Sequence, residues 1–181
     1  MADIVELSAK ARAANLAMAM QAKTYVDGKI DIGAANQLPN SYWGWPARKL
    51  CVAESREQIA KDLAGKAEDM KRPGADKMKA MVDTWAYWAR HYGCGNCGEQ
   101  SALAFVQLRD MWKARPLDWM QVGDWKHGFV VIGRASGTIA ASIRTWNPEA
   151  VICDPWRGEA CPADQASWLI GETIGLIYRI T

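Results

Sequence analysis

The sequence predicts an α+β fold, and three observations support this class. Apolar residues recur at helical spacing through most of the chain before Pro116. After Pro116 the pattern changes to short runs rich in β-branched residues, each bounded by Gly, Pro or Asn. All helical segments precede these runs, so helices do not alternate with strands. We therefore expect N-terminal helices followed by a small antiparallel sheet.

Four helices are expected before Pro116. The first is rich in Ala and Met and ends near Asp27-Gly28. A loop from Gln37 to Pro46, unusually rich in aromatic residues, separates it from the second helix. Pro73-Gly74 separates the second helix from the third, and several glycines precede the fourth. The expected helices cover residues 3–25, roughly 54–70, roughly 75–91, and 97 to about 113.

Three strands are expected after Pro116. They cover residues 128–133 (GFVVIG), 150–154 (AVICD) and 175–181 (GLIYRIT), and residues 138–145 are a further strand candidate. The length of 181 residues fits a single domain. We expect residues 1–92 to form a helical N-terminal region, either an extension or part of the same domain. Residues 93–181 are then the core, in which the fourth helix packs on the sheet.

Charge and composition restrict the partners. The formal net charge is +2, and both signs are interspersed along the chain, so nucleic acid is not an expected partner. No run approaches the roughly 18 apolar residues that a membrane helix needs, and no export signal is visible at the N-terminus. Five Cys leave at least one thiol unpaired in a monomer, which favours a reducing cytosol. We expect the chain to be cytoplasmic as made.

Cys97 is the candidate nucleophile. Cysteine hydrolases need a thiolate, and a helix N-terminus supplies the partial positive charge and free N–H groups that stabilise it. Cys97 begins the fourth expected helix, and Gly93, Gly95 and Gly98 leave the backbone around it free of side chains. Cys51, Cys153 and Cys161 are interpreted as ordinary thiols.

His127 and Asp154 are the candidate base and its orienting carboxylate. The chain has two His, and His127 opens a strand, whereas His91 ends a helix close to Cys97 in sequence. Asp154 ends the strand before Pro155 and would accept a hydrogen bond from the imidazole. Asp124 is the rival, although neighbours three residues apart seldom point at each other on a strand.

Three motifs carry a family resemblance when they are taken in order. They are GNCGEQ followed by an amphipathic helix, then HGFVVIG, then VICDPW. Together they resemble the core of the papain-like and transglutaminase-like cysteine hydrolases, and are most similar to deamidase and protease domains of bacterial toxins and effectors. In those families the Cys heads a helix, the His begins a strand and the Asp ends the next strand, which are here Cys97, His127 and Asp154. The resemblance covers roughly residues 93–158. It implies that residues 93–181 are the catalytic core, in which the nucleophile-bearing helix headed by Cys97 packs on a small antiparallel sheet.

The resemblance implies a cysteine-dependent amide hydrolase that acts on protein substrates without a cofactor or metal. A Gln or Asn deamidase and a cysteine protease both remain open, and an amine acceptor would make the same site a transglutaminase. A toxin or effector would be delivered into a target cell by a secretion system. Its partners would include an immunity protein or a chaperone.

Further site residues are expected around these three. Asn96 and Gln100 are side-chain candidates for the oxyanion site, beside the backbone N–H of Cys97. The substrate-cleft candidates are four tryptophans, Trp43, Trp45, Trp125 and Trp156.

Two other classes of site use the same cysteines. Cys94 and Cys97 have the C-x-x-C spacing of a redox pair, but a helix rather than a strand is expected before them. A zinc site would draw its ligands from Cys94, Cys97, Cys153, Cys161 and His127. The alternative function is thus a non-catalytic zinc-binding or protein-interaction module with a structural Cys cluster.

Overall fold

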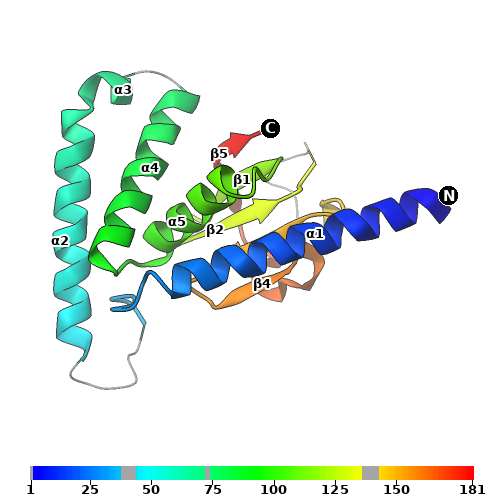
Figure 1. The fold of residues 1–181 in the computed structure, drawn as a ribbon, viewed down its shortest axis with the longest axis horizontal. Helices are drawn as coiled ribbons and strands as arrows, with labels where there is room; N and C mark the ends of the chain where they lie inside the picture. Colours follow the sequence, from blue (N-terminus) through cyan, green and yellow to red (C-terminus); the bar gives the residue numbers. More distant parts are fainter. Residues whose placement is uncertain (1, 38–43, 72–73, 136–142) are drawn as a thin grey trace.

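The computed structural model describes residues 2–37, 44–71, 74–135 and 143–181. Within these ranges the helices come first and an antiparallel sheet follows, so the α+β prediction is confirmed (Figure 1). The helices before the sheet are α1 (Ala2–Asp27), α2 (Gly44–Gly65), α3 (Ala67–Lys71), α4 (Ala75–Tyr92) and α5 (Cys97–Asp110).

The sheet has five strands in the order β4-β3-β2-β1-β5, and all neighbours are antiparallel. Its central pairing runs from Leu117 opposite Ile132 to Val122 opposite His127. The strands are β1 (Leu117–Val122), β2 (His127–Ile132), β3 (Val151–Asp154), β4 (Glu159–Pro162) and β5 (Ile174–Ile180).

Each face of the sheet packs on a different layer. Val130 and Cys153 face a core shared with α1, α4 and α5. Phe129 and Ile152 face the opposite side, where short 3₁₀ turns at Ile143–Thr145, Ala163–Gln165 and Ser167–Leu169 cover them. Side chains alternate along a strand, so His127 shares its face with Phe129, and Asp154 shares its face with Ile152. The two polar side chains therefore emerge on the same face of the sheet.

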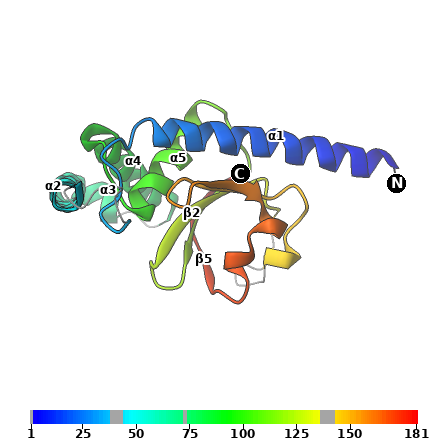
Figure 2. The same ribbon diagram turned by 90° about the horizontal axis from the view of Figure 1, so that it is seen from below.

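Helix α1 runs along the helical face of the sheet (Figure 2). Its second half contributes Ala19, Ala22 and Val26 to the core, all with no exposed surface. Its first turns extend past the sheet, and Ile4 there is 71% exposed. In the described part of the chain, no helix combines the length and apolar character needed to cross a bilayer.

Several element boundaries differ from those expected. Helix α2 begins at Gly44, so the predicted loop up to Pro46 is wrong at its end, because Pro is tolerated in the first turn of a helix. The second expected helix is divided at Lys66 into α2 and α3. Strands β1 and β4 were not expected. Of the strand candidate 138–145, residues 143–145 form a 3₁₀ turn, and the rest lies outside the described residues.

Cys51 of α2 and Cys94 form a disulfide, with their Cα atoms 6.3 Å apart. The interpretation of Cys51 as an ordinary thiol is therefore wrong, and connectivity of this kind cannot be deduced from the sequence alone. Cys97, Cys153 and Cys161 are free. The disulfide ties the middle of the helical region to the loop that precedes α5.

Candidate functional site

Cys97 is the first residue of α5, and the loop before it is held at several points. Gly93 ends α4 in the left-handed conformation, with φ of 68°, where an added Cβ would lie 2.3 Å from Oδ1 of Asp31. The N–H of Gly95 donates to the carbonyl of Gly33, and the Gln100 amide donates to the carbonyl of Gly95. The nucleophile candidate therefore follows a loop with a fixed path.

Glu99 and Arg56 stabilise the start of α5. Glu99 is 1% exposed, and its Oε2 accepts a hydrogen bond from the backbone N–H of Asn96, the N-cap residue that precedes the helix. Arg56 of α2 reaches both carboxylate oxygens of Glu99, with Nε 2.6 Å from Oε1 and Nη2 3.3 Å from Oε2. The hydrogen bond to Glu99 raises the pKa of Arg56, against the effect of burial, and the charge of Cys97 adds to the increase. The guanidinium of Arg56, paired with the Glu99 carboxylate, thus lies near the thiol.

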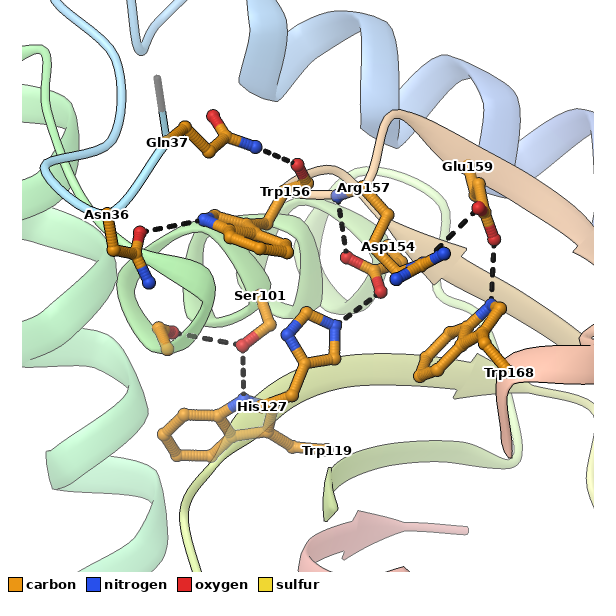
Figure 3. A network of polar contacts seen from close by, with 11 residues as sticks. Asn36, Gln37, Ser101, Trp119, His127, Asp154, Trp156, Arg157, Glu159 and Trp168 are labelled. Atoms are coloured by element: carbon orange, nitrogen blue, oxygen red, sulfur yellow. Dashed lines mark hydrogen bonds and ion pairs between the residues drawn. The ribbon is translucent and has the colours of Figure 1, made fainter. Parts of the chain in front are cut away.

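Gly128 allows β2 to approach the first turn of α5, and Gly98 allows Trp85 of α4 to pack against the same turn. An added Cβ on Gly128 would lie 2.9 Å from Oγ of Ser101 and 3.5 Å from the carbonyl oxygen of Cys97. On the helix side, a Cβ on Gly98 would lie 2.6 Å from the Trp85 ring. Ser101 donates to the carbonyl of Gly98 and accepts from Nε1 of Trp119, which joins the helix to β1 (Figure 3). This close packing brings His127, the first residue of β2, to Cys97.

His127 is oriented by Asp154 and enclosed by aromatic rings (Figure 3). Its Nε2 lies 2.5 Å from Oδ2 of Asp154, which is fully buried, while Oδ1 accepts the backbone N–H of Arg157. The ring centroids of Trp156 and Trp168 are 5.2 Å and 5.4 Å from that of His127. Since Nε2 is occupied by Asp154, Nδ1 is the ring nitrogen left for Cys97.

The environment of His127 favours its protonated form. Burial lowers its pKa, but hydrogen bonds to Asp154 and Cys97, together with the charges of both groups, outweigh burial and raise the pKa to about 9. The imidazolium form, with a proton on both ring nitrogens, is therefore favoured over the neutral imidazole. Such a group can pair with a thiolate and later give its proton to a leaving group.

Residues 31–37 hold both sides of this site. Ala35 donates its backbone N–H to Oδ1 of Asn96, beside the nucleophile candidate. On the other side, Nε1 of Trp156 donates to Oδ1 of Asn36 at 2.9 Å, and Gln37 donates to the carbonyl of Trp156 (Figure 3). The Trp156 ring is thereby fixed next to His127.

A pocket of about 560 Å³ opens beside Cys97. Helices α2, α4 and α5 and the start of β2, with the β1–β2 turn, form its wall. Its lining includes Cys97, Gly98, Gly128, Trp85, Trp125 and Met81.

The sequence candidates separate into those at the site and those away from it. Cys97, His127 and Asp154 come together, whereas Asp124 is exposed and His91 lies on the surface of α4, stacked on Tyr87. The amides expected at the oxyanion site both have backbone partners, with Asn96 accepting from Ala35 and Gln100 donating to Gly95. The Gln100 side chain is buried and absent from the pocket wall.

The four tryptophans proposed for a cleft differ in position. Trp125 lines the pocket and is 48% exposed, and Trp156 packs on His127. Trp45 lies in the first turn of α2, where its Nε1 donates to the Ala35 carbonyl and Lys49 lies over its ring. Trp43 lies outside the described residues.

Sequence reasoning missed four residues of this site, namely Arg56, Trp85, Glu99 and Trp168. The spacing N-x-x-E at Asn96 and Glu99 is a capping-box signature that identifies Glu99. Arg56 and the two tryptophans have no local signal, because their contacts join segments distant in sequence.

The arrangement of the cysteines does not favour the redox pair or the zinc site considered from the sequence. Cys94 is bonded to Cys51 and so is unavailable as a redox partner for Cys97 or as a zinc ligand. The thiol of Cys153 is fully buried, its contact is the carbonyl of Ala19, and burial raises its pKa strongly. Across the described ranges, no three His, Cys, Asp or Glu side chains are grouped to hold a metal ion.

Comparison with known proteins gives no match to a family model, a curated protein or a solved structure.

Proposed function

We propose that this protein is a cysteine-dependent amide hydrolase that acts on protein substrates, with the core arrangement of the papain-like and transglutaminase-like enzymes. Cys97 is the nucleophile, His127 the general acid and base, and Asp154 the group that orients the imidazole. The proposal rests on one arrangement. His127 is hydrogen-bonded to buried Asp154 through Nε2 and interacts with Cys97, which lies at the start of a helix.

In the first half of the reaction, the Cys97 sulfur attacks the amide carbon and forms a C–S bond as the carbonyl electron pair moves onto oxygen. The N–H groups in the first turn of α5 have no partner within the helix, so the backbone N–H of Cys97 can stabilise this oxyanion. Protonated His127 then transfers its proton to the amide nitrogen. The C–N bond breaks, an amine or ammonia leaves, and a thioester remains.

In the second half, neutral His127 takes a proton from water as the water oxygen attacks the thioester carbon. The C–S bond breaks, the acid product leaves, and the pair of Cys97 thiolate and protonated His127 is restored. An amine in place of water would give transamidation. Asp154 accepts a hydrogen bond from Nε2–H throughout, and this bond keeps Nδ1 directed at the sulfur.

The substrate amide is a peptide bond in a protease, or a Gln or Asn side chain in a deamidase. The resemblance of GNCGEQ, HGFVVIG and VICDPW to toxin and effector domains supports a target in another cell. It also supports delivery by a secretion system and an immunity protein or chaperone as partner. These assignments rest on likeness of short motifs and form part of the proposal.

The first test is the rate of Cys97 alkylation by iodoacetamide from pH 5 to 9, followed by peptide mapping, in wild type and His127→Ala. Cys161 serves as an internal reference, because burial and nearby carboxylates raise its pKa. We expect Cys97 to react at pH 6, where an ordinary thiol near pKa 8.5 is almost unreactive, and we expect His127→Ala to remove this reactivity.

The proposal fails if Cys97 follows the same pH profile as Cys161 in wild type. Zinc in stoichiometric amount in the purified protein, with Cys97 protected from alkylation, would instead support the structural-zinc alternative. The assay is run without reductant, so that Cys51 and Cys94 stay paired and do not react.

A further inference from the structure

The wall of the pocket beside Cys97 is mostly apolar. Ile59, Leu63 and Met81 contribute aliphatic surface from α2 and α4, and Trp85 and Trp125 contribute two rings whose centroids are 6.1 Å apart. Trp85 also packs edge-on against Trp119 of β1, which fixes its position. Trp85 and Met81 are therefore packed against the core on one side and line the pocket on the other.

The charges in the wall are neutralised within it. Arg56 and Glu99 belong to the lining, but each is the other's partner through two contacts. Glu99 is 1% exposed, so its carboxylate is not offered to a ligand. A charged group entering the pocket would lose its hydration without gaining a free counter-charge, whereas an apolar group would gain by leaving water.

The pocket is larger than the side-chain amide of Gln or Asn requires. Its volume of about 560 Å³ lies in the range of sites that hold whole small molecules. The carboxamide of a Gln or Asn side chain would fill only a small part of it. Since Cys97, Gly98 and Gly128 form one part of the wall, a group in the pocket is attached close to the carbonyl that the sulfur attacks.

We infer that this pocket is the specificity site of the enzyme, and that it selects amide substrates with a bulky apolar group, aromatic or long aliphatic, beside the reacting carbonyl. This inference rests on the proposed function. It names the class of substrate, and it applies to a protease or to a deamidase that reads the residue next to its Gln or Asn.

The test uses chloroacetamides, which alkylate Cys97 when its sulfur displaces chloride from the CH₂ carbon. The probes carry N-benzyl, N-octyl or N-(2-hydroxyethyl) groups, and each rate is divided by the rate of the same probe with glutathione. We expect the corrected rates at Cys97 for the two apolar probes to exceed the hydroxyethyl rate by about tenfold or more, because burying a group of this size is favourable by that order.

Ala60→Glu places a carboxylate in the pocket wall at an exposed position of α2 that a helix former tolerates. We expect this variant to reduce the ratio of the corrected rates, apolar probes over hydroxyethyl probe, to near one. Ala53→Glu is the matched control, since Ala53 is exposed on the same helix but does not line the pocket, and the preference should remain.

Equal corrected rates for all three probes in wild type would overturn the inference, as would an equal loss of preference in Ala53→Glu and Ala60→Glu. The preference is the ratio of two alkylation rates at one pH. It is therefore independent of how the rate of Cys97 alkylation changes with pH or in His127→Ala. A lost preference with a normal pH profile removes the pocket assignment alone, whereas an ordinary pH profile removes the proposed function.

Discussion

His127 and Asp154 meet across two neighbouring strands, with Nε2 of the imidazole 2.5 Å from Oδ2 of the carboxylate. The antiparallel register between β2 and β3 puts both side chains on one face of the sheet, and Asp154 is fully buried there. A second hydrogen bond, from the backbone N–H of Arg157 to Oδ1, fixes the carboxylate. The orientation of the imidazole is thus set by the sheet itself.

Asp154→Asn should lower the pKa of His127 from about 9 towards its ordinary value of 6.5, because the hydrogen bond to the carboxylate and its charge both favour the imidazolium. The ring protons of His127, followed by NMR against pH, measure this shift. Cys97 alkylation at pH 6 should fall at least about tenfold. Asp124→Asn is the control, since Asp124 is exposed, and an equal effect there would contradict the assignment.

The same pKa predicts how stability depends on pH. A His whose folded-state pKa is raised from 6.5 to about 9 stabilises the fold fully below pH 6.5 and loses this contribution as pH rises through 9. At 1.36 kcal/mol per pKa unit the contribution is about 3 kcal/mol at most. Urea unfolding should show a higher free energy of unfolding for wild type than for Asp154→Asn at pH 6, and a much smaller difference at pH 9.5. If this difference in free energy of unfolding grew with pH, the raised pKa of His127 would be contradicted.

Arg56→Gln should destabilise the protein by roughly 1–3 kcal/mol, because it leaves the buried Glu99 carboxylate with the Asn96 N–H as its remaining described partner. Arg56 is half exposed, which keeps the effect below that of a fully buried pair. Arg56→Lys retains the charge without the two-point geometry, so an intermediate loss is expected. Denaturant unfolding measures both variants. A double-mutant cycle with Glu99→Gln should give a coupling energy of similar size, and additive effects would refute the pairing.

Gly98→Ala and Gly128→Ala should each cost about 1–3 kcal/mol, since the added methyl would lie within 3 Å of Trp85 or Ser101. Both changes should also slow Cys97 alkylation, because Gly128→Ala pushes β2 away from α5 and Gly98→Ala displaces the Trp85 ring of α4 next to Cys97. Gly65→Ala is the matched control, with nothing within 4 Å of its Cβ position. It should leave both thermal unfolding and alkylation unchanged or raise stability slightly. Equal behaviour of the three variants would rule out the close-packing account.

Removal of the Cys51–Cys94 disulfide should lower stability by about 3–4 kcal/mol, as expected for a link between residues 43 apart. Urea unfolding of Cys51→Ala/Cys94→Ala against wild type measures this. Cys97 should also become less reactive at pH 6, because the loop before it loses an anchor. Cys161→Ala controls for loss of a thiol. If the double variant keeps wild-type stability, the disulfide does not form in solution.

Much of the fold was predictable because its signals are local. The helical spacing of apolar residues and the Gly and Pro breaks predicted the helices, and Cys97 and His127 were placed at the start of their elements. Strand β1 was missed because its sequence, LDWMQV, contains Asp118 and Gln121 and lacks regular alternation. Asp118 is nevertheless buried, since Arg134, brought near by the fold, pairs with it at 2.7 Å.

The site was predictable only in part, for the same reason. The order of motifs identified three residues, and the structure brings them together. The ion pair between Arg56 and Glu99 spans 43 residues, and no local pattern reports it. The pocket depends on how α2 packs against α4 and α5, which is a property of tertiary packing. Local sequence thus indicated the three candidate residues, whereas their surroundings could be seen only in the fold.

The disulfide also has a topological consequence. Residues 51–94 form a covalently closed ring that contains α2 from Cys51 onward, α3 and α4, and this ring supplies one wall of the pocket. A single backbone cleavage inside the ring would leave both fragments attached to each other. Nicked protein should therefore migrate as one species on a non-reducing gel and separate into two only after reduction. The segment that forms the pocket wall facing Cys97 thus stays covalently attached to the rest of the chain after one cut.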